Sequence, residues 1–242
     1  TMIQNHKGTF IMAESGCMHT EENSLESIAA GHDNGADGCC LHFDLTKDCI
    51  PILGKDGKVT ASDGAITLLS NFTFDELRPF CKRLVTAGQA IDLAKSYAYQ
   101  IAFRVSTPKI IPFVRIALKY SEYLSRAYML CGASKDTLEL IQRYPDLNFM
   151  LDVPSLSGNV NELLLFVKDS GFYGIQIRPE EADSSFVAKA QRLGLCVSSA
   201  PTDDEFHLRR MVDMNINYIH TSRPDIASLF MPVGDNAPEG NH

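Results

Sequence analysis

Cys40 and His42 are the two side chains whose spacing most clearly suggests chemistry. They lie two residues apart in the apolar stretch 38–43, which reads as a β-strand, so both point to one face of that strand. Glu14 follows another apolar stretch, 9–13, which we expect to be the neighbouring strand. A thiolate, an imidazole and a carboxylate together form a ligand set for zinc. The alternative is that the thiol and the imidazole only hydrogen-bond to each other or to water.

The elements that carry these residues alternate along the chain. Apolar stretches predict eight strands (9–13, 38–43, 101–105, 127–131, 149–153, 174–177, 196–199 and 218–220). Helical patterns lie between them (24–34, 91–97, 112–126, 135–143, 160–168, 184–192 and 204–213). Strand–helix units with right-handed crossovers predict an α/β protein with a single (β/α)8 TIM barrel. An open doubly wound sheet is the alternative, but this chain lacks the glycine-rich phosphate loop that usually follows the first strand of such a sheet.

Local signals mark the ends of these helices. Asn23 with Glu26 three residues later predicts an N-cap, and an apolar stripe in the helix at 112–126 places Tyr120 in the core. Glycines that follow helical patterns and precede strands are expected at the C′ position, and these are Gly35, Gly171 and Gly194.

Residues 46–85 are too many for one strand-to-helix connection. They contain an expected strand at 51–53 and an expected helix at 74–81. We therefore expect a capping insertion over the barrel mouth, after the second strand, within one domain that spans residues 1–242.

Composition narrows the function further. The chain has 242 residues, of which 45% are hydrophobic, and its net charge of −8 comes without a basic cluster, which argues against a nucleic-acid partner. No apolar run approaches the roughly 18 residues of a membrane helix. The cysteine count of seven is odd and the spacing shows no framework, so reduced thiols in a cytoplasmic protein are expected.

Motifs along the whole chain resemble the glycerophosphodiester phosphodiesterase family. The segments that carry the resemblance are AESG and EENS, GADGCCLHFDLTKD, PILGKD, IAFR, and the closing stretch from CVSSAPTDD to IHTSRPD. The resemblance implies a phosphodiesterase TIM barrel that acts in lipid metabolism. It also implies two histidines for proton transfer and three carboxylates that hold Mg²⁺ or Ca²⁺, a hard cation suited to oxygen ligands.

The residues at the matching positions differ from that pattern. Glu14 and Lys55 stand at the positions of the two histidines, and Ser15 stands at that of a phosphate-binding arginine. Cys40 and His42 replace two of the metal carboxylates. Ala102 replaces the third, while Arg104 keeps a positive charge in place of a lysine. The frame of the motifs is retained at Gly16, Glu22, Asn23, Asp37, Thr46, Lys47, Asp48, Asp56, Thr221, Pro224 and Asp225.

These replacements imply a catalytically degenerate family member, a pseudoenzyme. It would bind a small polar or phosphate-bearing ligand, such as a glycerol phosphate or a phosphodiester, through Ser15, Arg104 and Glu22. Glu14 and Lys55 are expected to form an ion pair across the position of the family's catalytic site. No cofactor is expected. Zinc bound by Cys40 and His42 is the alternative. Mg²⁺ or Ca²⁺ would bind only if other residues restored the family's metal site.

Two enzymatic alternatives remain open. One is a divergent phosphoric diester hydrolase that acts through a rebuilt site of Glu14, Cys40, His42 and Lys55. In the other, a histidine outside the family pattern, such as His19 or His220, restores ordinary phosphodiesterase activity.

Overall fold

Eight parallel strands form a closed barrel in the computed structural model, which describes residues 8–232. The barrel strands are β1 (Phe10–Ala13), β2 (Gly38–Leu45), β6 (Gln100–Arg104), β7 (Ala127–Cys131), β8 (Asn148–Asp152), β9 (Gly174–Ile177), β10 (Cys196–Ser199) and β11 (Tyr218–Thr221). β1 pairs in parallel with both β2 and β11, which closes the ring. The predicted (β/α)8 barrel is therefore confirmed, and the open sheet is excluded.

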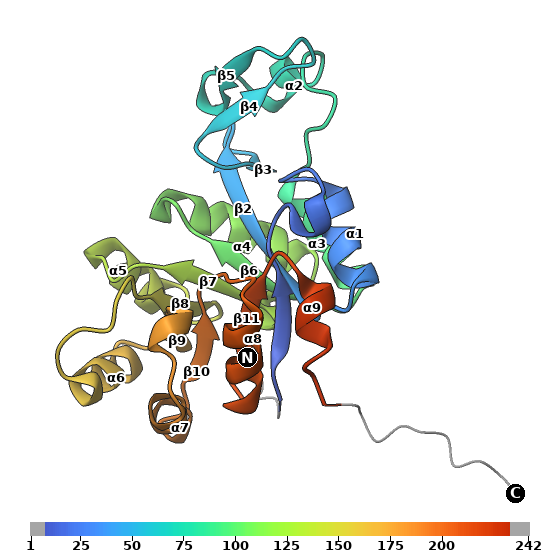
Figure 1. The fold of residues 1–242 in the computed structure, drawn as a ribbon. Coiled ribbons are helices and arrows are strands. Elements are labelled where there is room, and N and C mark those ends of the chain that lie inside the picture. The colour runs from blue at the N-terminus through green and yellow to red at the C-terminus, as the bar shows by residue number, and fades with distance from the viewer. Residues whose placement is uncertain (1–7, 233–242) are drawn as a thin grey trace, which may run out of the picture.

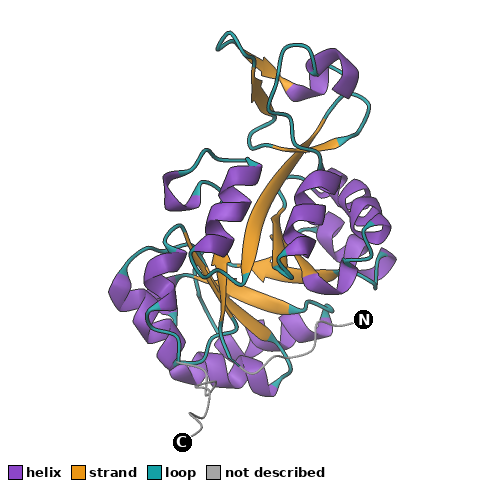
Figure 2. Ribbon diagram, turned by 90° about the vertical axis from the view of Figure 1, so that its right-hand side faces the viewer, coloured by secondary structure: helices purple, strands orange, loops and turns teal. Residues whose placement is uncertain are grey.

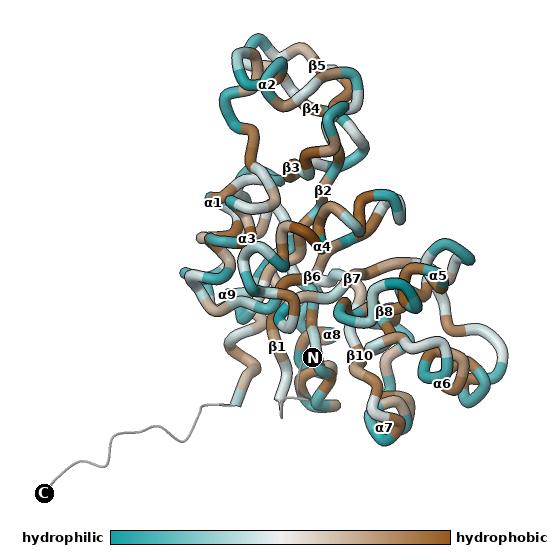
Figure 3. Tube along the Cα trace, turned by 180° about the vertical axis from the view of Figure 1, so that it is seen from behind, coloured by the Kyte–Doolittle hydropathy of each residue, from teal (hydrophilic) through white to brown (hydrophobic). Residues whose placement is uncertain are grey.

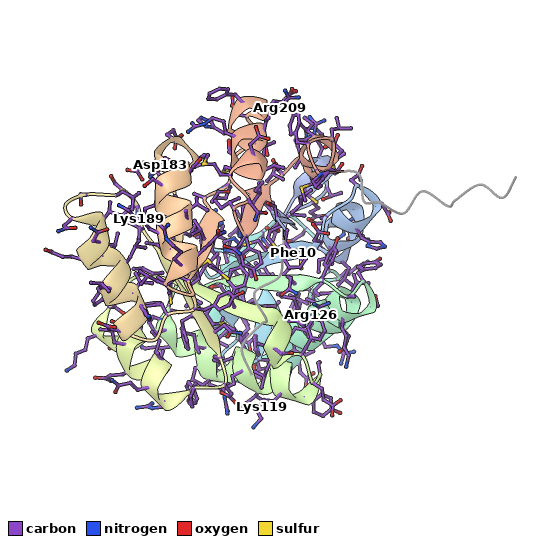
Figure 4. All side chains as sticks on the ribbon, turned by 90° about the horizontal axis from the view of Figure 1, so that it is seen from below. Phe10, Lys119, Arg126, Asp183, Lys189 and Arg209 are labelled. Atoms are coloured by element: carbon purple, nitrogen blue, oxygen red, sulfur yellow. The ribbon has the colours of Figure 1, made fainter. Side chains whose placement is uncertain are left out.

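Helices surround this barrel, as the view from below in Figure 4 shows. They are α1 (Leu25–Asp33), α3 (Ala87–Ser96), α4 (Ile111–Tyr120), α5 (Lys135–Arg143), α6 (Val160–Asp169), α7 (Ser184–Arg192), α8 (Glu205–Asp213) and α9 (Pro224–Ser228). Short 3-10 turns are η1 (Cys17–His19), η2 (Leu69–Asn71), η3 (Pro108–Ile110), η4 (Leu124–Arg126) and η5 (Pro179–Glu181). Hydrophilic residues are conspicuous on α5, α6 and α7 (Figure 3). Within residues 8–232, no helix combines the length and the apolar character that crossing a membrane requires.

Alternating side chains of the strands divide the apolar interior into two clusters. One set packs between the barrel and the helices and includes Cys39, Phe103 and Ile219. The other set fills the inside of the barrel (Met12, Cys40, Ala102, Tyr128, Leu130, Met150, Cys196 and Tyr218). Cys39 and Cys40 thus point to opposite sides of β2, as the period of a strand requires.

Two local predictions were wrong. The N-cap of α1 is Ser24, whose hydroxyl accepts a hydrogen bond from the Ser27 amide, because Asn23 has a φ of +56° and cannot adopt the extended cap conformation. Tyr120 is 92% exposed rather than part of the core. Helix α4 ends at Tyr120, and the chain turns at Glu122 with a φ of +54°, so the stripe does not continue to residue 126.

The three C′ glycines are confirmed, with φ between +81° and +86°. Such left-handed angles carry no steric penalty at glycine, so each helix ends there and the chain turns into the next strand.

The segment at 46–85 stands at the carboxyl end of β2 and projects away from the barrel (Figures 1 and 2). β3 (Pro51–Leu53) pairs antiparallel with the end of β2, and β4 (Lys58–Thr60) with β5 (Ile66–Leu68). α2 (Phe74–Leu77) is shorter than predicted, because Pro79 has no amide hydrogen with which to continue the helical hydrogen bonds. A separate apolar cluster of Ile52, Leu69, Leu77 and Cys81 holds these pieces together.

Close strand packing inside the barrel gives a test of this fold. A Cβ atom at Gly174 would lie 2.3 Å from the backbone oxygen of Cys196, whereas at Gly132 it would meet nothing within 4 Å. We expect Gly174→Ala to lower the free energy of unfolding by about 1–3 kcal/mol, because backbone cannot yield as a side chain can. Gly132→Ala should stay within about 0.5 kcal/mol of the parent. Urea unfolding measures both, and equal stability of the two variants would contradict the close approach.

Candidate functional site

The predicted site residues gather at the carboxyl end of the barrel strands. Glu14 directly follows β1, and Cys40 and His42 lie on β2. In the β2–β6 ladder Cys40 is opposite Ala102, and His42 is opposite Arg104. Since alternate residues face the interior, Cys40 and Ala102 lie one level deeper than His42 and Arg104.

Glu14 is the centre of a buried polar network. Its Oε1 accepts a hydrogen bond from Arg104 Nη2 at 3.1 Å and lies 2.7 Å from His220 Nδ1. The side chains of Glu14 and Arg104 are only 15% and 22% exposed. Burial by itself would raise the pKa of Glu14, but the bond to His220 and the charge of Arg104 outweigh it and lower the pKa to about 2. Glu14 is therefore ionised at neutral pH.

His220 is fully buried on β11, the strand beside β1, and it extends this network across the barrel interior. Its Nε2 lies 3.0 Å from the hydroxyl of Tyr128, which is also fully buried. Burial raises the pKa of Tyr128 well above its ordinary value, so the phenol keeps its proton and can donate to Nε2. The Nδ1 atom of His220 faces Glu14 Oε1, so both ring nitrogens of the buried imidazole have hydrogen-bond partners. The alternation of Tyr218 and His220 along one strand was the signal that could have placed His220 inside.

A carboxylate, an imidazole and a hydroxyl in series resemble the arrangement that activates a nucleophile. Here the terminal hydroxyl belongs to Tyr128, which lies inside the closed apolar cluster of the barrel and has 0% exposure. A substrate cannot approach that oxygen. The chain of bonds from Tyr128 to Arg104 therefore serves to fix Glu14.

The expected ion pair between Glu14 and Lys55 is wrong. Within residues 8–232, Glu14 forms an ion pair with Arg104 and a hydrogen bond with His220, and Lys55 takes part in no ion pair. The reason lies in the strand register. Arg104 lies on β6 beside His42 with an inward side chain, whereas Lys55 follows β3, and its side chain is exposed.

Glu14, Cys40 and His42 come together as predicted, since each offers a ligand atom within 4.8 Å of the others. The set does not fit Mg²⁺ or Ca²⁺, which require several oxygen ligands, because it has a single carboxylate and Ala102 has no donor. Burial raises the pKa of the Cys40 thiol, and the nearby charge of Glu14 raises it further. Burial lowers the pKa of His42, so its imidazole is neutral at neutral pH.

Lys55 and Arg104 line a pocket of about 280 Å³ at the mouth. Its wall also carries His42 and the carboxylates of Asp56 and Asp152. The pocket therefore presents two positive and two negative side chains beside an imidazole, a lining that suits a small anion that also carries hydroxyl groups.

Ser15 and Glu22, the other predicted ligand contacts, lie in the loop after β1. The hydroxyl of Ser15 accepts a hydrogen bond from the Asn23 amide at 2.7 Å, so it supports the entry to α1. Glu22 is exposed and lines a second pocket, of about 250 Å³, with Lys82 and Arg83. Neither residue lines the pocket of Lys55 and Arg104.

Replacing the central carboxylate tests this network. Glu14→Gln removes the carboxylate that pairs with the partly buried charge of Arg104, so we expect a loss of about 3 kcal/mol in the free energy of unfolding at pH 7. Because the folded-state pKa of Glu14 is lowered, its contribution is complete above the ordinary value of 4.5 and is lost as the pH falls through about 2. The difference from wild type should therefore shrink between pH 5 and pH 2 in urea unfolding series.

Glu26→Gln is the matched control, because Glu26 is exposed on α1. It should change stability by less than about 0.5 kcal/mol at every pH. A Glu14→Gln defect of constant size across this pH range would contradict the ionised state of Glu14.

Comparison with known proteins gives matches among solved structures. No protein-family model matches the chain, and neither does any curated protein sequence. A glycerophosphodiester phosphodiesterase from Parabacteroides distasonis has a TM-score of 0.74 and 21% identity, over 92% of this chain and 96% of that one. One from Thermotoga maritima has a TM-score of 0.76 and 14% identity, over 93% and 99%.

An Oleispira antarctica phosphodiesterase, solved with the product sn-glycerol-3-phosphate, has a TM-score of 0.75 and 15% identity, over 92% and 96% of the two chains. At these identities the similarity establishes the fold. The chain has the (β/α)8 barrel of the glycerophosphodiester phosphodiesterases, as its sequence motifs implied.

Proposed function

We propose that the protein is a catalytically degenerate, cytoplasmic member of the glycerophosphodiester phosphodiesterase family. It binds a small phosphate-bearing ligand of lipid metabolism at the barrel mouth. The observation that carries the proposal is the pocket of Lys55 and Arg104, set beside a site whose hard-cation ligands have been replaced. The motifs and the shared fold support the family assignment, and the free state of all seven cysteines suits a reducing compartment.

The site lacks the metal ligands and the proton donor that hydrolysis of a phosphodiester requires. Two of the positions that would supply metal carboxylates hold a thiol and an imidazole, and the third holds the methyl group of Ala102. A proton donor is also needed for the leaving oxygen, and general acids contribute roughly 10²–10⁴-fold in rate. Glu14 cannot serve, because its pKa of about 2 leaves it without a proton at neutral pH.

Binding of an anion requires only positive charge and hydrogen-bond donors, without a metal ion or a proton donor. The Lys55 side chain is exposed and, within the described part of the chain, free of ion pairs, so its ammonium group can turn toward a phosphate. Arg104 is fixed by Glu14 and presents the remaining donors of its guanidinium group to the pocket. Asp56 and Asp152 on the same wall would accept from hydroxyl groups of the ligand, as a glycerol phosphate offers.

Calorimetric titration with sn-glycerol 3-phosphate tests the binding. We expect one molecule to bind per chain, and Lys55→Ala to weaken the affinity about tenfold, the equivalent of about 1.4 kcal/mol for one charge-assisted contact. Lys47→Ala is the matched control, because Lys47 is exposed in the same segment but does not line the pocket. Absence of binding by the parent protein, or equal losses in the two variants, would contradict the proposed pocket.

Turnover measurements separate this function from a divergent enzyme. We expect no hydrolysis of glycerophosphocholine or glycerophosphoethanolamine above background with Mg²⁺ or Ca²⁺, because the ligand set does not suit these cations. The second candidate is a phosphoric diester hydrolase with a rebuilt site, which the proximity of Glu14, Cys40 and His42 favours. Robust turnover that disappears in Lys55→Ala would establish that candidate in place of the binding protein.

A further inference from the structure

The donor atoms of Glu14, Cys40 and His42 form a compact cluster at the barrel mouth. They lie within 4.8 Å of one another, and they come from the end of β1 and from one face of β2. Ligand atoms around a tetrahedral zinc ion, with bonds of about 2.0–2.3 Å, are about 3.5 Å apart. Rotamer adjustments of roughly an ångström would therefore bring the three donors to one ion.

We propose that Glu14, Cys40 and His42 bind a borderline-soft divalent cation, of which zinc is the first candidate. A thiolate and an imidazole select such metals over Mg²⁺ and Ca²⁺. The chain would then have exchanged a hard-cation site for one of different chemistry at the same end of the barrel. This proposal does not depend on the binding of a phosphate ligand.

Hydrogen bonds beyond the cluster orient the carboxylate. Arg104 and His220 both bond to Oε1 of Glu14, which leaves Oε2 as the oxygen for a cation. Tyr128 in turn fixes the ring of His220 from inside the barrel. Outer contacts of this kind orient metal ligands and raise the affinity for the metal.

Charge at the site is compatible with a divalent ion despite the presence of Arg104. Binding of M²⁺ breaks the S–H bond of Cys40, forms a metal–sulfur bond and releases the proton to solvent. The ion then faces two negative ligands, the Cys40 thiolate and the Glu14 carboxylate, which together neutralise it. Arg104 keeps its hydrogen bond to Glu14 Oε1, and the carboxylate of Asp152 adds a weaker attraction for the guanidinium group.

Solvent reaches the cluster from one side. His42 lines the pocket of about 280 Å³ that also contains Lys55 and Asp152. Three protein ligands beside an open pocket leave a fourth position for water or an anion, which is the pattern of zinc sites that act on ligands rather than hold a fold together.

Adjacent cysteines give a matched pair of variants. Cys39 and Cys40 are both buried, at 2% and 1% exposure, but Cys39 faces the helices and Cys40 faces the barrel interior. In a Cys49→Ser background, which removes the exposed thiol, we expect calorimetry to show one zinc ion per chain. Cys40→Ala should weaken zinc binding at least about 100-fold, whereas Cys39→Ala should leave the affinity within about threefold.

Cobalt provides a readout that does not depend on affinity. Co²⁺ bound to the parent protein should give the near-ultraviolet thiolate-to-metal charge-transfer band, which should persist in Cys39→Ala and vanish in Cys40→Ala. If Cys40→Ala does not fold, His42→Ala replaces it, because His42 is only partly buried and its loss should also weaken zinc binding at least about 100-fold.

The inference is overturned if the parent protein binds no stoichiometric zinc, or if Cys39→Ala and Cys40→Ala bind it equally. Mg²⁺ in large excess should not displace the metal, and displacement would also count against a soft site. Phosphate binding is measured separately on chelator-treated protein, so failure of the metal site leaves that result intact, and the reverse also holds.

Discussion

The ionised carboxylate of Glu14 inside the barrel mouth is the constraint on which the site depends. A buried charge is tolerated only when it is paired and hydrogen-bonded. Arg104 supplies the opposite charge from β6, and His220 supplies a second bond from β11. The bond from His220 to Tyr128 on β7 extends the network across the barrel. The four residues thus tie together strands that are far apart in the sequence.

This network gives the barrel mouth a buried carboxylate paired with a guanidinium group, in place of a cluster of carboxylates that could hold a hard cation. Hard-cation chemistry needs several oxygen ligands around an open position, but here the inward positions of β2 and β6 carry a thiol, an imidazole, a methyl group and a guanidinium group. Arg104 brings a fixed positive charge to the mouth, and it is held there by Glu14. Attraction for an anion needs only positive charge, whereas metal-assisted hydrolysis needs a bound cation and proton transfer as well.

Residues retained from the motif frame have structural roles that do not depend on catalysis. A carboxylate oxygen of Asp37 accepts a hydrogen bond from the Ile11 amide at 2.8 Å and so joins the start of β2 to β1. Asp48 accepts from the Thr46 hydroxyl and from the Phe74 amide, which fixes the base of the projecting segment. Replacing such residues would affect folding, whatever the protein does at the barrel mouth.

The sequence by itself determined the architecture and the position of the site along the chain. Strands Ala127–Cys131, Gly174–Ile177 and Cys196–Ser199 and helices Lys135–Arg143 and Ser184–Arg192 have the predicted bounds, because alternation and helical period are properties of a few consecutive residues. The motifs likewise placed Glu14, Cys40, His42 and Arg104 at the barrel mouth.

Only the tertiary structure decided which of these groups touch. Arg104 and His220 are 90 and 206 residues from Glu14, and no local pattern ranks them above Lys55 as its partners. The inward direction of His220, the exposure of Tyr120 and the cap at Ser24 were likewise missed. The cap at Ser24 and the end of α4 follow from the positive φ angles of Asn23 and Glu122. The inward direction of His220 follows from the register of β11 in the closed barrel. Local periodicity determines which face of an element a side chain lies on. The partners of a buried charge depend on which groups the closed barrel places within hydrogen-bond distance.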